Sequence, residues 1–200
     1  EKEGSLSGNR ATDSLRHPGS AYKPLSVYAP ALEAGLITPS TVMDDAPFQV
    51  EGNAAWPANV DRIYRGRMSV MEAVQRSSNP GAVRTLALLP PEESLDFLVD
   101  KLGFGDELVY EEERYGRVYT DVALAPLAMG GLTDGVSVLN MAAAYSVFPR
   151  EGVYLESRTY TTVRDASGKF ILDNTVGRVG EEVISQETAW YMNYLLKNAV

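Results

Sequence analysis

Prolines divide the first 150 residues into short segments, and this most limits the folds open to the chain. Proline lacks a backbone N–H and interrupts a helix beyond its first turn. Pro18-Gly19 therefore precedes a helix over residues 20–34, which Pro30 should kink. Pro80 stands at the first position of another helix, which Pro90-Pro91 stops. The sequence thus predicts a helix-rich chain built from short elements.

Capping signals mark further helices along the chain. Ser69 and Glu72 form a capping box for a helix that runs to about Arg76. We expect Asn79 to cap the helix that contains Pro80. Other helices are expected over residues 92–102, with Gly103 as the C-terminal cap, and over residues 136–148, which should be buried. Residues 36–67 show no sustained period and are expected to be an irregular segment, of the kind that often lines a cleft.

The character of the chain changes after residue 152. Two strands around a Gly-containing turn are expected over residues 153–184, and a helix capped by Ser185 follows them. We therefore expect residues 1–200 to be part of a single domain. Its parts are an entry loop (1–19), a helical portion (20–152), a strand hairpin (153–184) and the start of a C-terminal helix (185–200).

Charge and composition exclude several classes of protein. The net charge is −9, whereas a nucleic-acid-binding surface needs clustered basic residues. The trio Arg62, Arg65 and Arg67 is interpreted as a solvated loop. The chain has no cysteine and one histidine, His17, so cysteine-based zinc sites and a Ser-His-Asp triad are disfavoured. The longest apolar stretch, 122–132, is too short to span a bilayer, and the polar start has no signal peptide and reads as a loop cut mid-chain.

Ser20 and Lys23 form an S-x-x-K motif directly after the Pro-Gly break. Residues at i and i+3 share a helix face, so the hydroxyl and the amine should come within hydrogen-bonding reach. A lysine kept neutral by burial could take the serine proton without a histidine. The alternative is a solvated lysine on the first turn of an ordinary helix, and by itself the motif has little specificity.

A second candidate is the turn Ser77-Ser78-Asn79 between two short helices. A serine there could relay protons, and an asparagine amide could hydrogen-bond a substrate carbonyl or amide. The alternative is structural, with Asn79 as a helix cap and Ser77 as a polar turn residue.

The order of four longer segments resembles that of the penicillin-binding proteins, specifically the transpeptidase domain of the bifunctional class A enzymes. The segments are NRATDSLRHPGSAYKP, YAPALEAGLITPSTVMDDAPF, WPANVDRIYRGRMSVMEAVQRSSNPGAVRTL and LAPLAMGGLTDGVSVLNMAAAYSVFPREGVY. The resemblance covers the chain from about Asn9 to its end. It implies an α+β fold of the β-lactamase/transpeptidase type, in which helices flank an antiparallel sheet.

The resemblance also implies the site and the reaction. Ser20 would be the acylated nucleophile, Lys23 its proton acceptor, Ser77 the relay to the leaving amine and Asn79 the group that grips the substrate backbone. Trp56 would wall the cleft or serve in packing. The implied activity is a D,D-transpeptidase that cross-links peptidoglycan stem peptides ending in D-Ala-D-Ala and that β-lactams acylate, with no cofactor or metal. The implied location is outside the cytoplasmic membrane, with an anchor upstream of this chain.

The sequence departs from the family in one respect. No Lys-Thr-Gly or close variant occurs, although the family places one on a strand lining the cleft. We therefore expect much of the sheet to lie outside this chain, a second chain or a missing segment to supply the motif, and the 200 residues alone to be poorly active.

Two other functions share these residues. A non-catalytic penicillin-binding sensor, or inactive homologue, would keep the fold without turnover. A hydrolase, either a D,D-carboxypeptidase or a β-lactamase, would release the acyl group to water. No glutamate here has an asparagine four residues later, the pattern of class A β-lactamases, so a long-lived acyl-enzyme is expected.

Overall fold

The computed structural model describes residues 8–51, 54–158 and 160–199. The helical elements are η1 (Gly19–Tyr22), η2 (Pro24–Tyr28), α1 (Ala29–Glu33), α2 (Val70–Gln75), α3 (Asn79–Leu86), α4 (Pro91–Leu102), α5 (Leu124–Met129), α6 (Val138–Tyr145) and α7 (Gln186–Lys197). The first seven residues of the predicted entry loop lie outside the described residues. None of the described helices combines the length and the apolar character needed to cross a bilayer.

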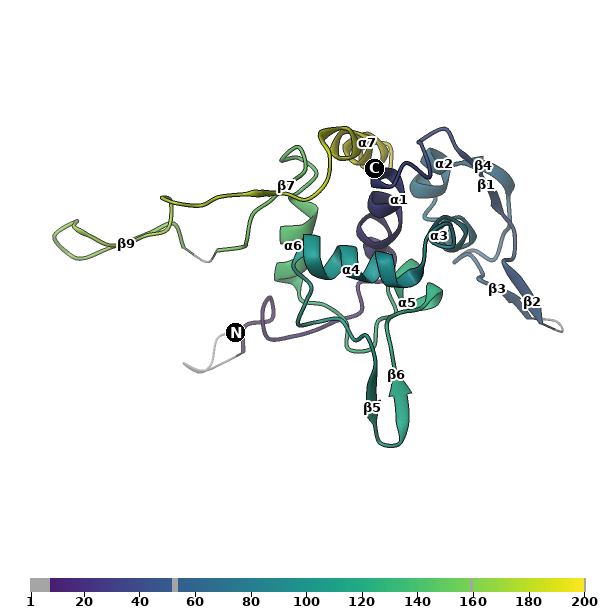
Figure 1. Cartoon of the computed structure of the whole chain (residues 1–200), viewed down its shortest axis with the longest axis horizontal. Coiled ribbons are helices and arrows are strands. Elements are labelled where there is room, and N and C mark those ends of the chain that lie inside the picture. Colours follow the sequence, from purple (N-terminus) through teal and green to yellow (C-terminus); the bar gives the residue numbers. More distant parts are fainter. Residues whose placement is uncertain (1–7, 52–53, 159, 200) are drawn as a thin grey trace.

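The strands of the described residues form two-stranded antiparallel pairs. The pairs are β1 (Val42–Asp45) with β4 (Gly66–Ser69), β2 (Gln49–Glu51) with β3 (Ala54–Trp56), β5 (Glu112–Arg114) with β6 (Arg117–Tyr119), β7 (Val153–Tyr154) with β10 (Glu181–Glu182), and β8 (Thr162–Arg164) with β9 (Phe170–Asp173). The β8–β9 hairpin forms the tip of an arm that extends away from the helical body (Figure 1). This hairpin confirms the two strands predicted around a Gly-containing turn.

The helical run Gly19–Glu33 lies at the centre of the molecule. It contacts α3, α4, α5 and α7, and its side chains Tyr22 and Leu25 are fully buried. The Tyr22 ring meets the ring of Phe104 edge to face at 5.7 Å between centroids. Full burial of a leucine or aromatic side chain contributes about 2 kcal/mol, so this run is strongly held in place.

The type of helix changes along this run. A kink was expected at Pro30, and the structure has a change of helix type just before this residue. The first turn is a 3₁₀-helix, residues Pro24–Tyr28 form a π-helix, and the α-helical part begins at Ala29. The N–H of Ala29 donates to the carbonyl of Pro24, five residues earlier. The wider turn comes directly before Pro30, whose nitrogen carries no hydrogen to donate.

Two predicted helix starts are partly corrected. Ser69 caps α2 by accepting from the N–H of Glu72 at 3.1 Å, but the Glu72 carboxylate accepts from Arg76 instead of returning to Ser69. Ser78, rather than Asn79, caps α3, since its hydroxyl accepts from the N–H of Gly81 at 2.9 Å. The side chain of Asn79 is therefore available for another contact.

Two segment predictions also differ from the structure. Residues 36–67 are not wholly irregular, because β1, β2 and β3 lie within them and β1 pairs with β4. The helix expected over 136–148 is shorter, and its first residue, Val138, is 55% exposed, so one face packs on the core and the other does not. The hairpin β5–β6 was not predicted.

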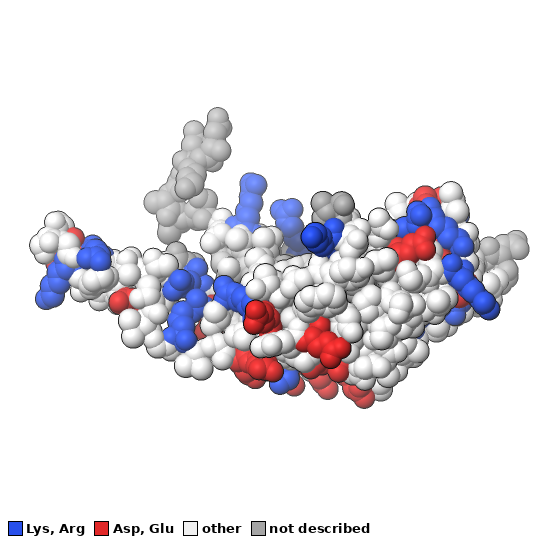
Figure 2. Space-filling view, turned by 90° about the horizontal axis from the view of Figure 1, so that it is seen from above, with Lys and Arg blue, Asp and Glu red and all other residues white. Residues whose placement is uncertain are grey.

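Surface charge is mixed on the face seen from above, where acidic side chains gather along the lower margin (Figure 2). Arg62, Arg65 and Arg67 are exposed. The predicted solvated loop is correct for Arg62 and Arg65, whereas Arg67 lies in strand β4 and pairs with Asp44 of β1.

Gly130, which ends α5, allows the start of the central run to approach closely. Its φ is +68°, and a Cβ at this position would overlap the backbone of Gly19. The N–H of Gly19 donates to the carbonyl of Gly130 at 3.2 Å. A side chain here would combine left-handed strain with a backbone clash.

Gly130→Ala should therefore lower the free energy of unfolding by at least about 2 kcal/mol. Thermal unfolding measures the loss. Gly131→Ala is the matched control, because Gly131 has open space where a Cβ would be placed and no positive φ. Equal melting temperatures for the two variants would contradict the role given to Gly130.

Candidate active site

The amine of Lys23 is buried at the junction of the central run and the α2–α3 turn. The residue is 2% exposed. Its Nζ donates to the Ser77 carbonyl at 2.7 Å, to Ser77 Oγ at 3.1 Å and to Asn79 Oδ1 at 2.6 Å. An ammonium group has three donors, so these three acceptors satisfy its protonated form. The structure thus brings Lys23, Ser77 and Asn79 together from positions more than 50 residues apart.

Burial lowers the pKa of Lys23 to about 8. The three acceptors are neutral, and within the described part of the chain no carboxylate is bonded to the amine to hold its charge. A neutral amine is therefore accessible near physiological pH, which is the state required of a proton acceptor. The solvated lysine, the alternative considered from the sequence, does not describe this buried amine.

Ser20 lines the same pocket as Lys23 and Ser77. This pocket has a volume of about 220 Å³ and is completed by Tyr28 and by Leu196 near the end of α7. In the described residues the Lys23 amine is bonded to Ser77 and Asn79, and no hydrogen bond joins it to Ser20 Oγ. The hydroxyl–amine contact expected from the i, i+3 spacing is therefore absent, because the Ser77 and Asn79 oxygens occupy all three donors of the amine.

Contacts from two other helices hold the first turn of the central run. Besides the Gly19–Gly130 hydrogen bond, the Tyr145 hydroxyl donates to the Ala21 carbonyl at 2.7 Å. The site residues Ser20 and Lys23 flank Ala21, so α5 and α6 together fix the position of the S-x-x-K turn.

The Ser77 backbone adopts a conformation that favours glycine. Its φ is +53°, directly after the C-terminal residue of α2. Left-handed backbone at a residue with a side chain costs about 1–3 kcal/mol and persists only where its surroundings enforce it. Here the turn directs both the carbonyl and the hydroxyl of Ser77 at Lys23.

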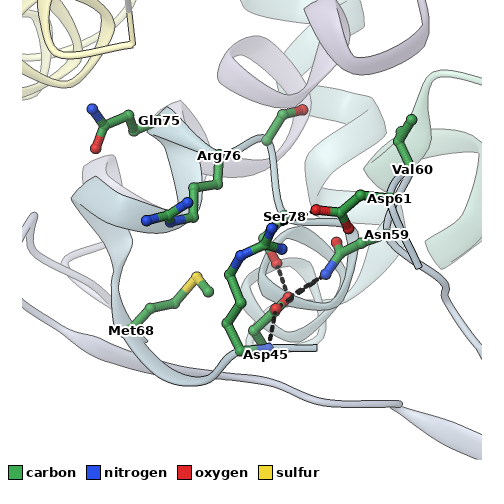
Figure 3. A pocket seen from close by; sticks show the side chains of 10 residues that line it. Asp45, Asn59, Val60, Asp61, Met68, Gln75, Arg76 and Ser78 are labelled. Carbon is green, nitrogen blue, oxygen red and sulfur yellow. Dashed lines mark hydrogen bonds and ion pairs between the residues drawn. The ribbon is translucent and has the colours of Figure 1, made fainter. Parts of the chain in front are cut away.

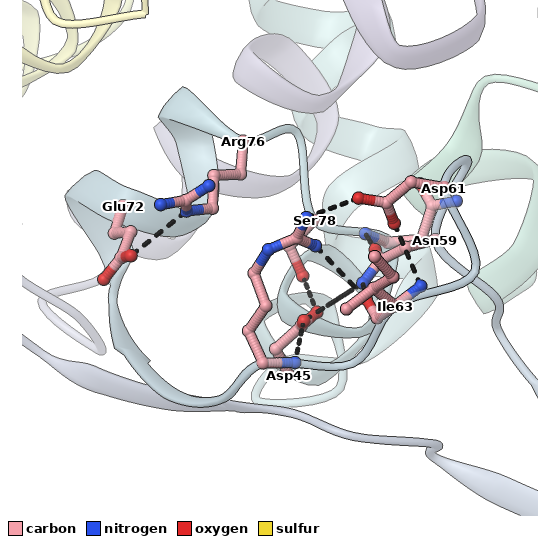
Figure 4. Close-up of polar contacts among 9 residues, drawn as sticks. Asp45, Asn59, Asp61, Ile63, Glu72, Arg76 and Ser78 are labelled. Carbon is pink, nitrogen blue, oxygen red and sulfur yellow. Dashed lines mark hydrogen bonds and ion pairs between the residues drawn. The ribbon is translucent and has the colours of Figure 1, made fainter.

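A buried carboxylate, Asp45 of β1, holds the Ser77–Asn79 turn from behind (Figure 4). Asp45 is 0% exposed and accepts from Ser78 Oγ at 2.6 Å, from Asn59 Nδ2 at 2.9 and 3.0 Å and from the N–H of Arg65 at 2.8 Å. Asn59 Oδ1 in turn accepts from the N–H of Asn79 at 2.9 Å. The turn is therefore tied to β1 and to the loop before β4.

Asp45 and Asn59 were not identified from the sequence. They lie 33 and 20 residues before the groups they hold, and no short motif connects them with the turn. Their position in a Pro-, Asn- and Asp-rich segment gave no signal beyond a general association of such segments with clefts.

Trp56 and His17 do not reach the pocket of Ser20. Trp56 lies in β3, where its ring meets the ring of Phe48 edge to face at 6.2 Å, which assigns it to packing rather than to the wall of this pocket. His17 is exposed on the surface. The structure therefore gathers four of the five predicted residues around one site and leaves Trp56 aside.

Comparison with protein families gives one match over nearly the whole chain. The model of the penicillin binding protein transpeptidase domain matches residues 2–200. Penicillin-binding protein 1A of Clostridium tetani is 33% identical over 100% of this chain and 25% of that protein. Penicillin-binding protein 1F of Bacillus subtilis is 33% identical over 96% of this chain and 24% of that protein. The chain thus spans about a quarter of the length of these curated relatives.

Solved structures of the same kind share the fold. Penicillin-Binding Protein 1A from Haemophilus influenzae superposes with a TM-score of 0.76 at 27% identity, over 96% of this chain and 31% of that chain. The D,D-transpeptidase domain of a peptidoglycan glycosyltransferase from Eggerthella lenta gives a TM-score of 0.76 at 21% identity, over 96% and 50% of the two chains. The predicted α+β fold of the transpeptidase type is confirmed.

Proposed function

Because this chain belongs to the penicillin-binding protein transpeptidase family, we propose that it carries the acyl-transfer site of a D,D-transpeptidase that cross-links peptidoglycan stem peptides. The observation that most supports this is the buried Lys23 amine, which shares one pocket with Ser20 and Ser77. A buried amine with a lowered pKa beside a serine is the arrangement that histidine-free acyl transfer requires.

In the acylation half-reaction, Ser20 Oγ forms a bond to the carbonyl carbon of the penultimate D-Ala. The neutral Lys23 amine takes the hydroxyl proton, and the carbonyl becomes an oxyanion near the first turn of the helical run. Ser77, bonded to Lys23, passes a proton to the leaving nitrogen as the C–N bond breaks and terminal D-Ala departs. The Asn79 amide holds the peptide backbone of the donor beside this turn.

The second half-reaction runs through the same groups in reverse. An amine of a neighbouring stem attacks the Ser20 ester and loses its proton through Ser77 to Lys23. Ser20 Oγ then leaves and recovers a proton. Division of the transfer into two steps through a covalent ester is nucleophilic catalysis. A β-lactam would acylate Ser20 by the same first step and remain attached.

The similarity to penicillin-binding proteins 1A and 1F supports a proposal for the setting of the whole protein. We place the site outside the cytoplasmic membrane of a bacterium, in a protein anchored by a segment outside these residues, with stem peptides as its natural partners.

Labelled benzylpenicillin tests this function in the full-length polypeptide that contains this chain. A stoichiometric, slowly hydrolysed adduct on the peptide that carries Ser20, together with transfer of a D-amino acid onto a D-Ala-D-Ala peptide, is the expected result. Fast release of penicilloate would instead indicate a hydrolase. A stable adduct without any peptide transfer would indicate a sensor, and an adduct elsewhere would exclude Ser20 as the nucleophile.

A further inference from the structure

A second, larger pocket lies next to the acyl-transfer site. Figure 3 shows the side chains that line it, among them Asp45, Asn59 and Arg76. Its volume is about 470 Å³. Gln75 and Ser77 line both pockets, so the two pockets adjoin at these residues. A substrate whose carbonyl lies at Ser20 can therefore extend across Ser77 into this second space.

Most of the charge around the second pocket is already paired. The Asp45 carboxylate is buried and accepts from Ser78, Asn59 and the backbone of Arg65. The Arg65 guanidinium binds the Asp61 carboxylate and the Ile63 carbonyl (Figure 4). Because Asp45, Asp61 and Arg65 are already bonded to protein groups, they have little capacity to bind a charged ligand.

Arg76 is paired too, but in the part of the chain that the structure describes only one of its guanidinium nitrogens is bonded. Its Nε donates to Glu72 Oε1 at 3.1 Å, one turn earlier in α2, and this bond orients the side chain. Among the described residues its two terminal amino groups have no hydrogen-bond partner. The guanidinium lies across the pocket from Asn59 and Asp61 in Figure 3.

We propose that the open edge of the Arg76 guanidinium binds a carboxylate carried by the donor peptide. A planar guanidinium presents two parallel N–H donors that match a carboxylate, and such charge-assisted bonds are stronger than neutral ones. Arg76 directly precedes Ser77, which lines both pockets, so the subsite adjoins the pocket of Ser20. This inference rests on the proposed function and adds the class of donor, an acidic peptide.

Two penicillins that differ by one carboxylate on the acyl side chain test the subsite. Benzylpenicillin lacks this group and carbenicillin has it. Second-order rate constants for acylation of the full-length polypeptide are measured with both compounds. Arg76→Gln should slow acylation by carbenicillin about fivefold relative to benzylpenicillin, the size of one partly exposed charged pair. Arg76→Glu should lower the ratio of the carbenicillin rate constant to the benzylpenicillin rate constant further. A salt concentration of about 1 M should reduce the difference between the unmodified polypeptide and these variants.

Arg117→Gln, an exposed arginine on β6, is the matched control and should leave the ratio unchanged. One outcome would contradict the subsite alone. In it, benzylpenicillin acylates Ser20 at the same rate in all variants, and Arg76→Gln leaves the carbenicillin-to-benzylpenicillin rate ratio unchanged. The proposed function would then stand. If neither compound acylates the unmodified polypeptide, the proposed function fails and the subsite fails with it. If the variants have equal melting temperatures, a changed rate ratio results from altered binding and not from loss of folded protein.

Discussion

Lys23→Met should reduce the rate of Ser20 acylation by about 10²–10⁴-fold, because a positioned general base contributes that much. Methionine fills similar space but accepts no proton. Removal of the amine leaves the Ser77 carbonyl, the Ser77 hydroxyl and Asn79 Oδ1 without their donor, so the variant should also unfold at a lower temperature at pH 7. Stopped-flow acylation with a chromogenic β-lactam and a melting curve measure the two effects.

Two further variants separate proton transfer from charge. Lys23→Arg keeps a cation that stays protonated, so it should be as slow as Lys23→Met. Lys169→Met, an exposed lysine in the β8–β9 turn, should react at the normal rate. Full acylation by Lys23→Arg would show that a positive charge, and not a base, is what the reaction needs.

The lowered pKa of Lys23 also sets how the acylation rate and the free energy of unfolding depend on pH. The neutral amine is the reactive form, so acylation should rise about tenfold per pH unit up to a pH of about 8 and then level off. In the unfolded chain the lysine pKa is about 10.4, so the unfolded state binds more protons between pH 8 and 10.4. Lys23 therefore makes the fold more stable as pH rises through that window, and Lys23→Met should lose this gain.

Asp45→Ala should lower the free energy of unfolding by about 3 kcal/mol, because Ser78, Asn59 and the N–H of Arg65 all lose their buried acceptor. For a domain of this size that is a fall of roughly 6–12 °C in melting temperature. Acylation should fall too, since the same bonds hold the Ser77–Asn79 turn against Lys23. Denaturation by urea and acylation kinetics measure the two losses.

Asp44→Ala is the matched control for this variant. Asp44 is the neighbouring residue of β1, with its side chain exposed. It should melt and react normally. A normal melting temperature for Asp45→Ala would show that water replaces the carboxylate at no cost and would contradict the role given to the network.

Local signals in the sequence predicted much of this structure. Ser69 and Ser185 as helix starts and Gly103 as a helix end were all confirmed, because each depends on contacts within five residues. The assignment of Asn79 as the cap of α3 was wrong, because Ser78 caps this helix. Both residue types cap helices well, and only the position of Lys23 decides which side chain is free.

The parts that sequence could not predict depend on distant partners. β1 was missed because its partner β4 begins 21 residues after β1 ends, and the intervening chain has no turn signature that fixes the pairing. Lys23 was expected to meet Ser20, three residues away, but its acceptors come from Ser77 and Asn79. The family resemblance named all four residues without giving these contacts.

The π-helical turn Pro24–Tyr28 sets the side of the molecule that the residues before it face. A π-turn holds one more residue than a turn of α-helix, so winding the same residues as a regular α-helix would rotate everything before them by about 100°. Ser20 and Lys23 would then face a different side of the molecule while Leu32 kept its place in the core. The wider turn therefore directs Ser20 and Lys23 towards the pocket that they share with Ser77.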